Sequence, residues 1–387
     1  MPWEETCAMD ERVKLVGDYL CEQWSITALS EIYGVSRKTI YRWIDRYDDD
    51  GIDGLKERSR APLSHPNATG PDIGEMIIKE KLHPQHWGPK KVMARLEAGS
   101  PERAWPAIST AGEILKRHGL VSRRRLRHRT SPYTEPFLDC NGSNVVWSAD
   151  FKGQFQTGDK RMCYPLTLTD NYSRYLLACR GLGRPTGEAT RPWLEWALRE
   201  YGLPRAIRTD NGTPFASVAL GGLSQLAVWL VKLGIRPEPI KMGQPQQNGR
   251  HERMHRTLKE ETASPPQRDL SKQQQAFDHF TREYNQVRPH EALGQKPPAS
   301  VYRPSQTRYP ARVPDVEYDS SFSVRQVRHN GEIKWKGQMV YVSQALAGEP
   351  VGLLQTDNEL WQVNFSFHPL GILDERTAKI TPTKGKV

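Results

Sequence analysis

The sequence is poor in cysteine and contains no long apolar run. Its five cysteines are odd in number and include no Cys-x-x-Cys pair, which favours reduced thiols in a cytoplasm over a disulfide framework or a zinc finger. No stretch approaches the roughly 18 uninterrupted apolar residues of a membrane span, and the first residues lack the basic and apolar segments of a secretory signal. No nucleotide-binding motif is found in it either. We therefore expect a cytoplasmic protein with no membrane partner and no nucleotide cofactor.

The charge of the chain indicates a polyanionic partner. Its 387 residues, enough for two to four domains at roughly 100–200 residues each, carry 55 Lys and Arg against 45 Asp and Glu. Such an excess is typical of nucleic-acid binding, although a solvated basic surface is the ordinary alternative. The excess is also concentrated, because residues 116–129 include seven Lys or Arg and no acid. We interpret this segment as an arm that contacts the DNA backbone through Arg123, Arg124, Arg125 and Arg127.

Residues 1–60 have the pattern of a helix-turn-helix domain. A short helical segment ends at Gly34, and Ser36 is a good N-cap for the next helix, residues 37–47. Apolar residues of that helix share one face. The basic residues towards its other face are Lys38, Arg42 and Arg46. A three-helix bundle with a solvated face is the alternative, but these basic residues lie where a recognition helix meets the major groove, so we predict a DNA-binding domain.

A second helical DNA-binding unit is expected at residues 68–130, beyond a linker that contains proline and glycine. Its helical segments are residues 72–82, 89–96 and 107–118. The basic arm leaves from the end of the last of them.

Residues 133–303 have the pattern of an α/β domain. Three β-rich runs come first, and helices then alternate with two more strands. The expected strands are residues 145–155, 162–169, 174–179, 206–209 and 235–240, and the expected helices are residues 188–201, 223–233, 249–261 and 271–285. We predict a five-stranded mixed sheet with flanking helices. Residues 316–387 contain short strands with Asn330-Gly331 as a hairpin signal and predict a small β-barrel.

Three acidic residues of the α/β domain need an explanation. Asp150 lies inside the first strand, where Asp is depleted and an unpaired buried carboxylate is unfavourable. Asp210 ends the fourth strand, and Glu252 lies in the first turn of a helix. Because ligands collect around the strand ends of an open sheet, three hard oxygen donors there would suit Mg²⁺ or Mn²⁺. Two of them have local alternatives, since Asp210 could begin a turn and Glu252 could pair with Arg256.

Four segments surround these acids and carry a specific pattern in combination. They are Trp147-Ser-Ala-Asp150-Phe-Lys-Gly, Thr209-Asp210-Asn-Gly-Thr-Pro-Phe215, Gln244-Pro-Gln-Gln-Asn-Gly-Arg-His-Glu252-Arg-Met-His-Arg-Thr-Leu-Lys259 and Tyr284-Asn-Gln-Val-Arg288-Pro-His-Glu-Ala-Leu-Gly294. The pattern resembles the integrase-like DDE transposases of bacterial insertion sequences, which are similar to retroviral integrases. The resemblance implies an RNase H-like catalytic core in which Asp150, Asp210 and Glu252 are catalytic and hold two Mg²⁺ or Mn²⁺ ions.

The resemblance also implies a function and its partners. A transposase of this kind binds the ends of a mobile DNA element, cleaves them and joins the 3′-hydroxyl to target DNA. Its partners are double-stranded DNA, as terminal repeats and as target, and further copies of itself in a homo-oligomer on that DNA. The implied location is the nucleoid in a bacterial cytoplasm.

Basic residues near the three acids are candidates for phosphate contacts. They are Lys152, Arg256 and Lys259, together with His255 on the same helix as Glu252. A solvated face explains each one equally well. Between Asp210 and Glu252 lie 41 residues, a few more than in many members of the family, and the extra length falls near residues 216–222.

Two other functions are compatible with the same residues. A sequence-specific DNA-binding regulator with an inactive core would need only the helix-turn-helix units, and the presence of all three acids argues against it. A metal-dependent nuclease would share the site and lack strand transfer. Residues 170–174 also match the family, but a turn between two strands explains them, and we leave them out of the catalytic set.

Overall fold

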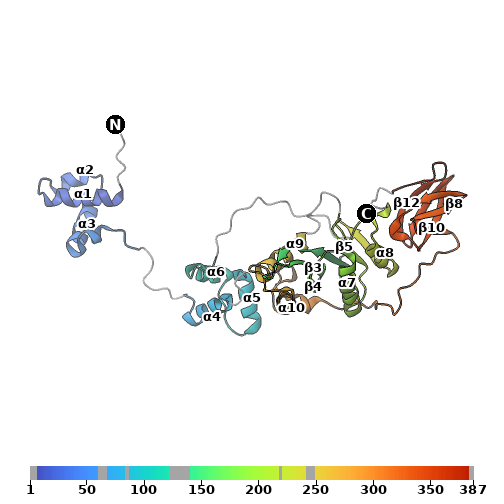
Figure 1. Cartoon of the computed structure of the whole chain (residues 1–387). Coiled ribbons are helices and arrows are strands. Elements are labelled where there is room, and N and C mark those ends of the chain that lie inside the picture. The colour runs from blue at the N-terminus through green and yellow to red at the C-terminus, as the bar shows by residue number, and fades with distance from the viewer. Residues whose placement is uncertain are drawn as a thin grey trace. The chain divides into compact units, whose positions relative to one another are not determined.

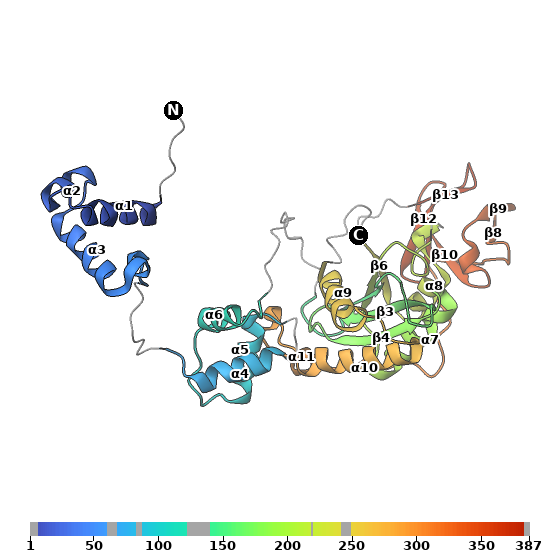
Figure 2. The ribbon, with the colours of Figure 1, turned by 60° about the vertical axis from the view of Figure 1, so that its left-hand side comes forward.

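The computed structural model describes residues 7–59, 68–82, 87–121, 140–217, 220–240 and 249–382. It divides into two compact units, Met1–Thr69 and Gly70–Val387, whose elements are labelled in Figure 1 and seen from another side in Figure 2. Within the described ranges, no helix is both long enough and apolar enough to cross a membrane.

The first unit is a small helical bundle that contains a helix-turn-helix. Its elements are α1 (Ala8–Leu20), α2 (Ile26–Ile32), α3 (Arg37–Asp50) and the 3₁₀ helix η1 (Gly51–Leu55). The turn between α2 and α3 contains Gly34 at φ +62°, a conformation that glycine adopts without steric conflict. Ser36 then caps α3 by accepting a hydrogen bond from the Thr39 amide. The predicted apolar face is confirmed, and its buried members are Ile40, Trp43 and Ile44.

Three helices open the second unit, at the positions that the sequence predicts. They are α4 (Pro71–Leu82), α5 (Pro89–Gly99) and α6 (Ile108–Arg117). Pro89 occupies the first turn of α5, where its missing N–H leaves no hydrogen bond unmade. Apolar residues of all three helices bury a common core around Trp87. The arm residues Arg123, Arg124, Arg125 and Arg127 lie outside the described residues.

A mixed β-sheet forms the centre of the second unit, as predicted. Its strands are β1 (Val146–Phe151), β2 (Phe155–Gln156), β3 (Met162–Asp170), β4 (Leu176–Leu182), β5 (Ala206–Thr209) and β6 (Arg236–Pro239). Strand β3 pairs antiparallel with β1, β2 and β4, whereas β1, β5 and β6 run parallel to one another. The first expected strand is divided into β1 and the two-residue β2, so the sheet has one short strand more than predicted.

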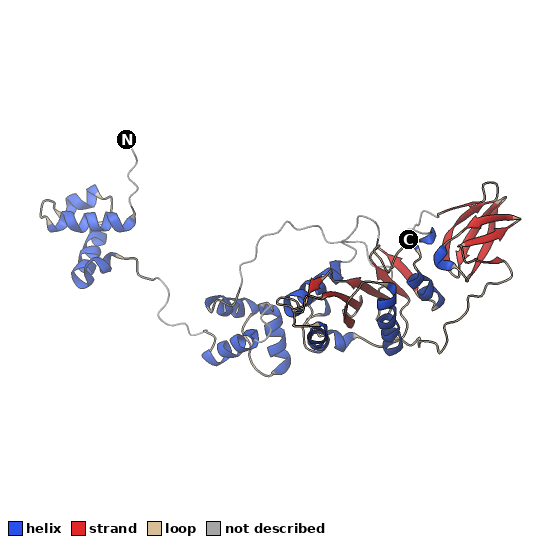
Figure 3. Ribbon diagram, in the orientation of Figure 1, coloured by secondary structure: helices blue, strands red, loops and turns tan. Residues whose placement is uncertain are grey.

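Helices cover both faces of this sheet (Figure 3). The helices of this part of the chain are α7 (Gly187–Tyr201), η2 (Leu220–Gly222), α8 (Gln225–Lys232), α9 (Gly249–Thr262), α10 (Leu270–Gln286), η4 (Glu291–Leu293) and α11 (Pro298–Val301). On one face, α7 and α8 pack against strand residues such as Trp147 and Leu168. On the other, α9 and α10 pack against Cys163 and Cys179. The sheet therefore has a buried core on each side, as a sheet between two helical layers requires.

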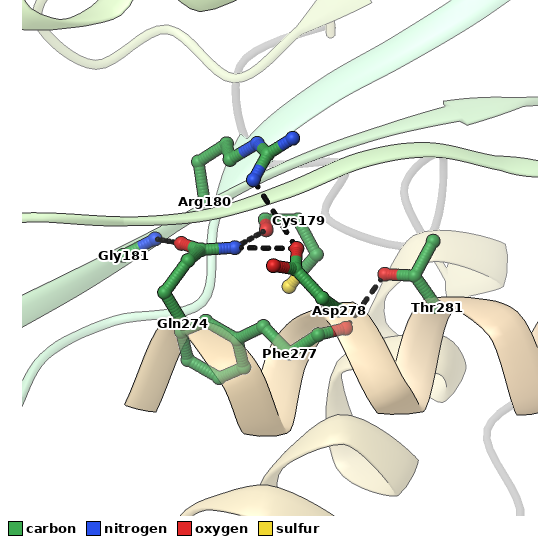
Figure 4. A network of polar contacts seen from close by, with 7 residues as sticks. All are labelled: Cys179, Arg180, Gly181, Gln274, Phe277, Asp278 and Thr281. Carbon is green, nitrogen blue, oxygen red and sulfur yellow. Dashed lines mark hydrogen bonds and ion pairs between the residues drawn. The ribbon is translucent and has the colours of Figure 1, made fainter. Parts of the chain in front are cut away.

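Helix α10 closes the edge of the sheet with side-chain amides. The Gln274 side chain accepts a hydrogen bond from the Gly181 amide and donates one to the Cys179 carbonyl, each at 2.9 Å (Figure 4). Asn285 makes the same pair of contacts with the amide and carbonyl of Leu176, at 2.8 and 2.9 Å. These amides satisfy backbone groups of β4 that would otherwise be open to another strand.

The C-terminal region is rich in antiparallel strands. They are β7 (Ser323–Gln326), β8 (Glu332–Trp335), β9 (Gln338–Tyr341), β10 (Pro350–Asp357), β11 (Leu360–Phe365), β12 (His368–Asp374) and β13 (Lys379–Thr381), with the 3₁₀ helix η5 (Gln344–Leu346) after β9. Five strands form one sheet in the order β13-β12-β11-β10-β7, and β8 and β9 form a separate hairpin. Closure into a barrel stays a prediction. The turn at Asn330-Gly331 precedes β8, and the paired hairpin turns instead between Trp335 and Gln338.

The extra length between Asp210 and Glu252 packs against this C-terminal region. The His368 side chain lies 3.0 Å from the Gly221 carbonyl oxygen. Helix α8 continues the contact, because Val228 and Val231 belong to the same apolar core as the C-terminal strands. Lys232 also forms an ion pair with Glu349, at 2.8 Å. The segment around Gly221 and helix α8 thus contact the C-terminal strands.

Candidate active site

The register of two parallel strands brings Asp150 and Asp210 to the same level of the sheet. Ala149 on β1 pairs with Thr209 on β5, and each acid is the next residue along its strand. Both carboxylates therefore lie at the C-terminal ends of neighbouring parallel strands, where open sheets bind ligands. The side chain of Asp150 is only 14% exposed. Two hard oxygen donors so placed fit the requirement of Mg²⁺ or Mn²⁺.

Asp210 also begins a turn, which is the alternative role that the sequence leaves open. Its side-chain oxygen accepts a hydrogen bond from the Gly212 amide at 3.1 Å. The neighbouring Asn211 side chain donates to the Ile240 carbonyl at 2.8 Å. The turn fixes the direction in which β5 ends, and a turn and a ligand role for Asp210 are compatible because a carboxylate accepts several bonds.

The sheet face beneath α9 is polar around Asp150. Successive strand residues point to opposite faces, so Asp150 lies on the face away from Ala149, which belongs to the core beneath α7 and α8. Thr167 lies directly across from Asp150 on β3. Thr169 follows two residues later on that same face, and both threonines are buried. Buried polar groups of this kind require hydrogen-bond partners from the covering helix.

Two histidines of α9 supply those partners. The Nε2 atoms of His251 and His255 each lie 2.6 Å from the Thr167 hydroxyl. The Nδ1 atom of His251 lies 3.0 Å from the Thr169 hydroxyl, and Nδ1 of His255 lies 3.9 Å from a carboxylate oxygen of Asp150. Burial lowers the pKa of His251 to about 3. Burial, with the nearby His251 and the positive charge of Lys152, also lowers the pKa of His255 well below its ordinary value.

Glu252 lies on the other side of α9. It is exposed, as are Arg256 and Lys259 one and two turns further along the helix. The three predicted ligands Asp150, Asp210 and Glu252 are all described, and they do not form a group whose ligand atoms lie within 4.8 Å of one another. Asp150, His251 and His255 do form such a group. The structure therefore brings two of the acids to one edge and leaves Glu252 on the outer face of the helix.

The two histidines correct the sequence analysis. His255, expected to hold a phosphate, is buried against the sheet, and His251 was not identified. A signal for both was present, since histidines four residues apart lie on one face of a helix and can bind a common partner. Lys152 lies close enough to the site for its positive charge to lower the pKa of His255.

The basic residues of α3 differ in their surroundings. Lys38 and Arg42 are exposed, as a DNA-contacting face requires. Arg46 is only partly exposed. Its guanidinium lies over the Trp43 ring, 4.5 Å from the centroid, and donates to the Lys56 carbonyl at 2.6 Å. It therefore connects α3 to the segment after η1.

The segment 170–174 has the structural role that the sequence suggests. Asp170 is buried and accepts hydrogen bonds from the amide and the hydroxyl of Ser173, at 2.8 and 2.5 Å. It also accepts one from the Asn144 amide at 2.8 Å. These bonds fix the turn between β3 and β4.

Protonation of the His290 side chain is expected to lower the stability of the folded protein at acid pH. It packs against the Tyr284 ring, with ring centroids 4.7 Å apart. Burial, followed by the positive charges of Lys91, Arg288 and Arg174, lowers its pKa to about 3. An unfolded chain binds this proton with a pKa of about 6.5. The contribution of neutral His290 to the free energy of unfolding is therefore complete above about pH 6.5 and is lost as the pH falls towards 3.

We expect His290→Phe to reduce this loss. Between pH 6.5 and pH 4, the free energy of unfolding should fall more steeply in the wild type than in the variant, by up to about 1.4 kcal/mol per pH unit. Urea unfolding at a series of pH values measures the difference. His329→Phe, at an exposed histidine, is the matched control. Parallel pH profiles for wild type and His290→Phe would contradict the prediction.

Models of known families match successive parts of the chain. A helix-turn-helix domain matches residues 11–62, and a homeodomain-like domain matches residues 39–115. Two integrase core domain models match residues 141–245 and 233–298. The C-terminal domain of IS481 family transposases matches residues 322–381.

Curated relatives come from insertion elements and retroviruses. A 39.2 kDa protein of insertion element IS476 from Xanthomonas euvesicatoria is 29% identical over 46% of this chain and 50% of its own length. A 31.7 kDa protein of insertion element IS407 from Burkholderia multivorans is 27% identical over 48% of this chain and 65% of its own. The Gag-Pol polyprotein of koala retrovirus is 27% identical over 50% of this chain and 11% of its own. The chain thus spans about half to two thirds of the two insertion-element relatives.

Solved structures of retroviral integrases are also similar. The HTLV-2 integrase catalytic core domain in complex with magnesium is 17% identical and covers 42% of this chain and 99% of its own, with a TM-score of 0.34. The simian T-cell lymphotropic virus intasome in complex with PP2A regulatory subunit B56 gamma is 16% identical and covers 71% and 97%, with a TM-score of 0.37. With helix-turn-helix, integrase core and IS481-type models matching in this order, the chain is similar to the integrase-like transposases of insertion sequences.

Proposed function

We propose that this protein binds the ends of a mobile DNA element, cleaves them and joins the freed 3′-hydroxyl to target DNA. One observation carries the proposal: the β1–β5 register sets Asp150 and Asp210 level with each other at the ligand-binding edge of an integrase core. We assign Glu252, in the first turn of α9, as the third acid, which would have to reach the other two from the exposed face of that helix.

The three carboxylates would hold two Mg²⁺ or Mn²⁺ ions. Such a pair of ions stabilises the attacking and leaving oxygens of an in-line phosphoryl displacement. Asp150, on the central strand β1, would be the acid closest to the centre of this metal site. Thr167 helps to fix the position of Asp150, because its hydroxyl donates a hydrogen bond to the Asp150 backbone carbonyl at 3.1 Å. Water is the nucleophile in cleavage, and the 3′-hydroxyl of the element end is the nucleophile in joining.

The remaining basic residues would hold the DNA. Lys152 follows Asp150 by two residues and its charge acts on His255, and Arg256 and Lys259 lie on the exposed face of α9 that also carries Glu252. We assign these three to phosphates near the reacting bond. The arm residues Arg123, Arg124, Arg125 and Arg127 would contact the backbone further away. Joining an element requires both of its ends, so we expect a homo-oligomer on double-stranded DNA in the bacterial nucleoid.

The exposed basic residues of α3 predict specific DNA binding. Arg42→Ala should weaken binding to element ends by about 1–3 kcal/mol if its guanidinium contacts a base edge. Lys14→Ala, at an exposed lysine of α1, is the matched control and should change binding much less. Fluorescence anisotropy with labelled end and unrelated DNA at several salt concentrations measures both effects. Equal losses for the two variants would mean that α3 is not the recognition helix.

A cleavage assay tests the proposed function as a whole. Labelled DNA that carries both ends of the element is incubated with the protein and Mg²⁺ and scored for nicked and joined products. The proposal predicts both. Nicked product alone would indicate a nuclease, and specific binding without either product would indicate a regulator with an inactive core.

A further inference from the structure

The Tyr284–Gly294 motif is part of the family pattern but has no role in the proposed cleavage and joining. Its first half is anchored in the sheet domain. Tyr284 packs against Phe280, with ring centroids 5.4 Å apart, in the core that α9 and α10 share with the sheet. Asn285 is buried and bonds to both backbone groups of Leu176 on β4. The motif therefore starts from a fixed place on the sheet.

The second half of the motif contacts the helices α4, α5 and α6. Val287, which follows α10, packs against the apolar core of these helices (Figure 2). Glu291, in η4, forms an ion pair with Lys90 in the first turn of α5, at 3.0 Å. Both of these charged side chains are exposed, so the ion pair adds little stability by itself. The apolar contact and the ion pair together place the three helices against the end of α10.

Arg288 lies where these contacts meet. Its guanidinium pairs with Glu261 at 2.6 Å and lies 3.4 Å from the Thr257 hydroxyl, and both partners belong to the second half of α9. The same guanidinium lies over the Trp87 ring, 5.9 Å from its centroid, and Trp87 is buried in the core of α4, α5 and α6. The Arg288 side chain is only 10% exposed. One buried cation thus connects these three helices to α9.

The contact at Glu261 restricts the whole of α9. Because an unpaired charge is unfavourable in a buried place, Arg288 and Glu261 hold each other in position. Helix α9 is continuous from Gly249 to Thr262, so a contact that holds its last turn also limits the movement of its first turn, where Glu252 lies. Glu252 and Glu261 are nine residues apart on it, about 14 Å along a helix axis.

We propose that Arg288 is a positioning residue that couples the helices α4, α5 and α6 to α9. Through this contact, DNA held by the three helices keeps a fixed relation to Glu252, so that the reacting bond meets the acids. The proposal rests on the proposed function for the DNA and for the role of Glu252. Arg288 acts on the reaction only through α9. Its loss should therefore affect the rate of joining more than the affinity for DNA.

The distance between two spin labels measures the coupling in the full-length chain, without DNA or metal. One label is attached to Glu97→Cys, at an exposed position of α5, and the other to Glu260→Cys, at an exposed position of α9. The three native cysteines that are not buried are first replaced by Cys7→Ser, Cys21→Ser and Cys140→Ser. With Arg288 in place, double electron–electron resonance should give one narrow distance distribution. A broad distribution in this chain would overturn the proposal, and the measurement requires no change at Arg288.

Variants of α10 and of the residues after it then test the role of Arg288 itself. Arg288→Met removes the charge and the hydrogen bonds but keeps an unbranched side chain, and it should broaden the distance distribution. Arg282→Met, at an exposed arginine of α10, is the matched control and should leave the distribution narrow. A narrow distribution in a folded Arg288→Met protein would overturn the proposal.

Joining kinetics test the consequence for the reaction. With saturating pre-nicked element ends and Mg²⁺, Arg288→Met should join DNA about 10–100-fold more slowly than the wild type, because a misplacement of about 1 Å can have an effect of that size. The Kd of the same ends should stay close to the wild-type value. Arg288→Lys, which restores a cation beside Glu261, should recover part of the rate. Equal losses of DNA affinity and joining rate, or no loss of either, would overturn the proposal.

The outcome is separable from that of the proposed function. If the wild type joins DNA and Arg288→Met joins it equally fast, the function stands and the coupling is wrong. If the wild type neither nicks nor joins DNA, while the distance distribution is narrow with Arg288 and broad without it, the coupling of the helices stands and the proposed function is wrong.

Discussion

Asp150→Asn should reduce DNA cleavage and DNA joining together by several orders of magnitude. The amide keeps the size of the side chain but removes the negative charge that two cations require. Metal ions contribute several kcal/mol of transition-state stabilisation, and each 1.36 kcal/mol is about tenfold in rate. Both steps should fall equally, because the proposed function assigns both to one site. Single-turnover rates on labelled element ends, with intact and with pre-nicked DNA, measure the two losses separately.

Controls distinguish this effect from misfolding. DNA binding through residues 1–130 should survive in Asp150→Asn, and thermal stability should be equal or higher, because the change relieves repulsion between carboxylates. Asp315→Asn alters an aspartate that is 78% exposed and should retain the wild-type rates. A folded Asp150→Asn protein that nicks element ends at nearly the wild-type rate would remove Asp150 from the catalytic set.

Glu252→Gln should cause a comparable loss of cleavage and joining, although its surroundings are different. Glu252 is exposed in the first turn of α9, so its replacement removes few protein contacts. Its expected effect comes entirely from the lost charge near the metal ions. The melting temperature should therefore stay within about 1 °C of the wild-type value, since exposed substitutions rarely change stability by more than about 0.5 kcal/mol.

The same helix provides a matched control. Glu260→Gln changes another exposed glutamate of α9, two turns further on, and should leave both rates unchanged. If Glu252→Gln and Glu260→Gln both keep wild-type rates, Glu252 is not a ligand. The catalytic metal would then be held by Asp150, Asp210 and a residue other than Glu252.

Much of this fold could be predicted because local rules and the tertiary structure agree. Ser36 caps α3 where an N-cap is expected, and Pro89 lies in the first turn of α5. Asp150 was identifiable because a carboxylate inside a strand has no local explanation. Asp210 followed from its place at a strand end, and the β1–β5 register then sets it beside Asp150.

The orientation of α9 could not be predicted, because it depends on which strand residues lie beneath it. His255 turns inwards since Thr167, brought opposite Asp150 by the β1–β3 register, offers it a buried hydroxyl. The sequence of α9 alone, with polar residues on most sides, does not reveal that partner. Arg46 is a similar case, because its hydrogen bond to the Lys56 carbonyl depends on how the chain turns back after α3.

The C-terminal region shows a third limit. Asn330-Gly331 does form a turn, with Gly331 at φ +81°, but the strands on either side of it are not paired in one sheet. A turn signal predicts a reversal of the chain, and pairing depends in addition on which strands meet. Similarly, nothing local indicates that Gly221 would contact His368.

The central claim is that one site uses a DNA 3′-hydroxyl as its nucleophile. It is tested most directly with pre-nicked element ends that carry either a 3′-hydroxyl or a 3′-deoxy terminus, mixed with the wild-type protein, target DNA and Mg²⁺. We expect joined product from the hydroxyl ends, none from the deoxy ends, and none with Asp150→Asn. Joined product from deoxy ends, or no joined product from hydroxyl ends that the protein binds, would contradict the claim.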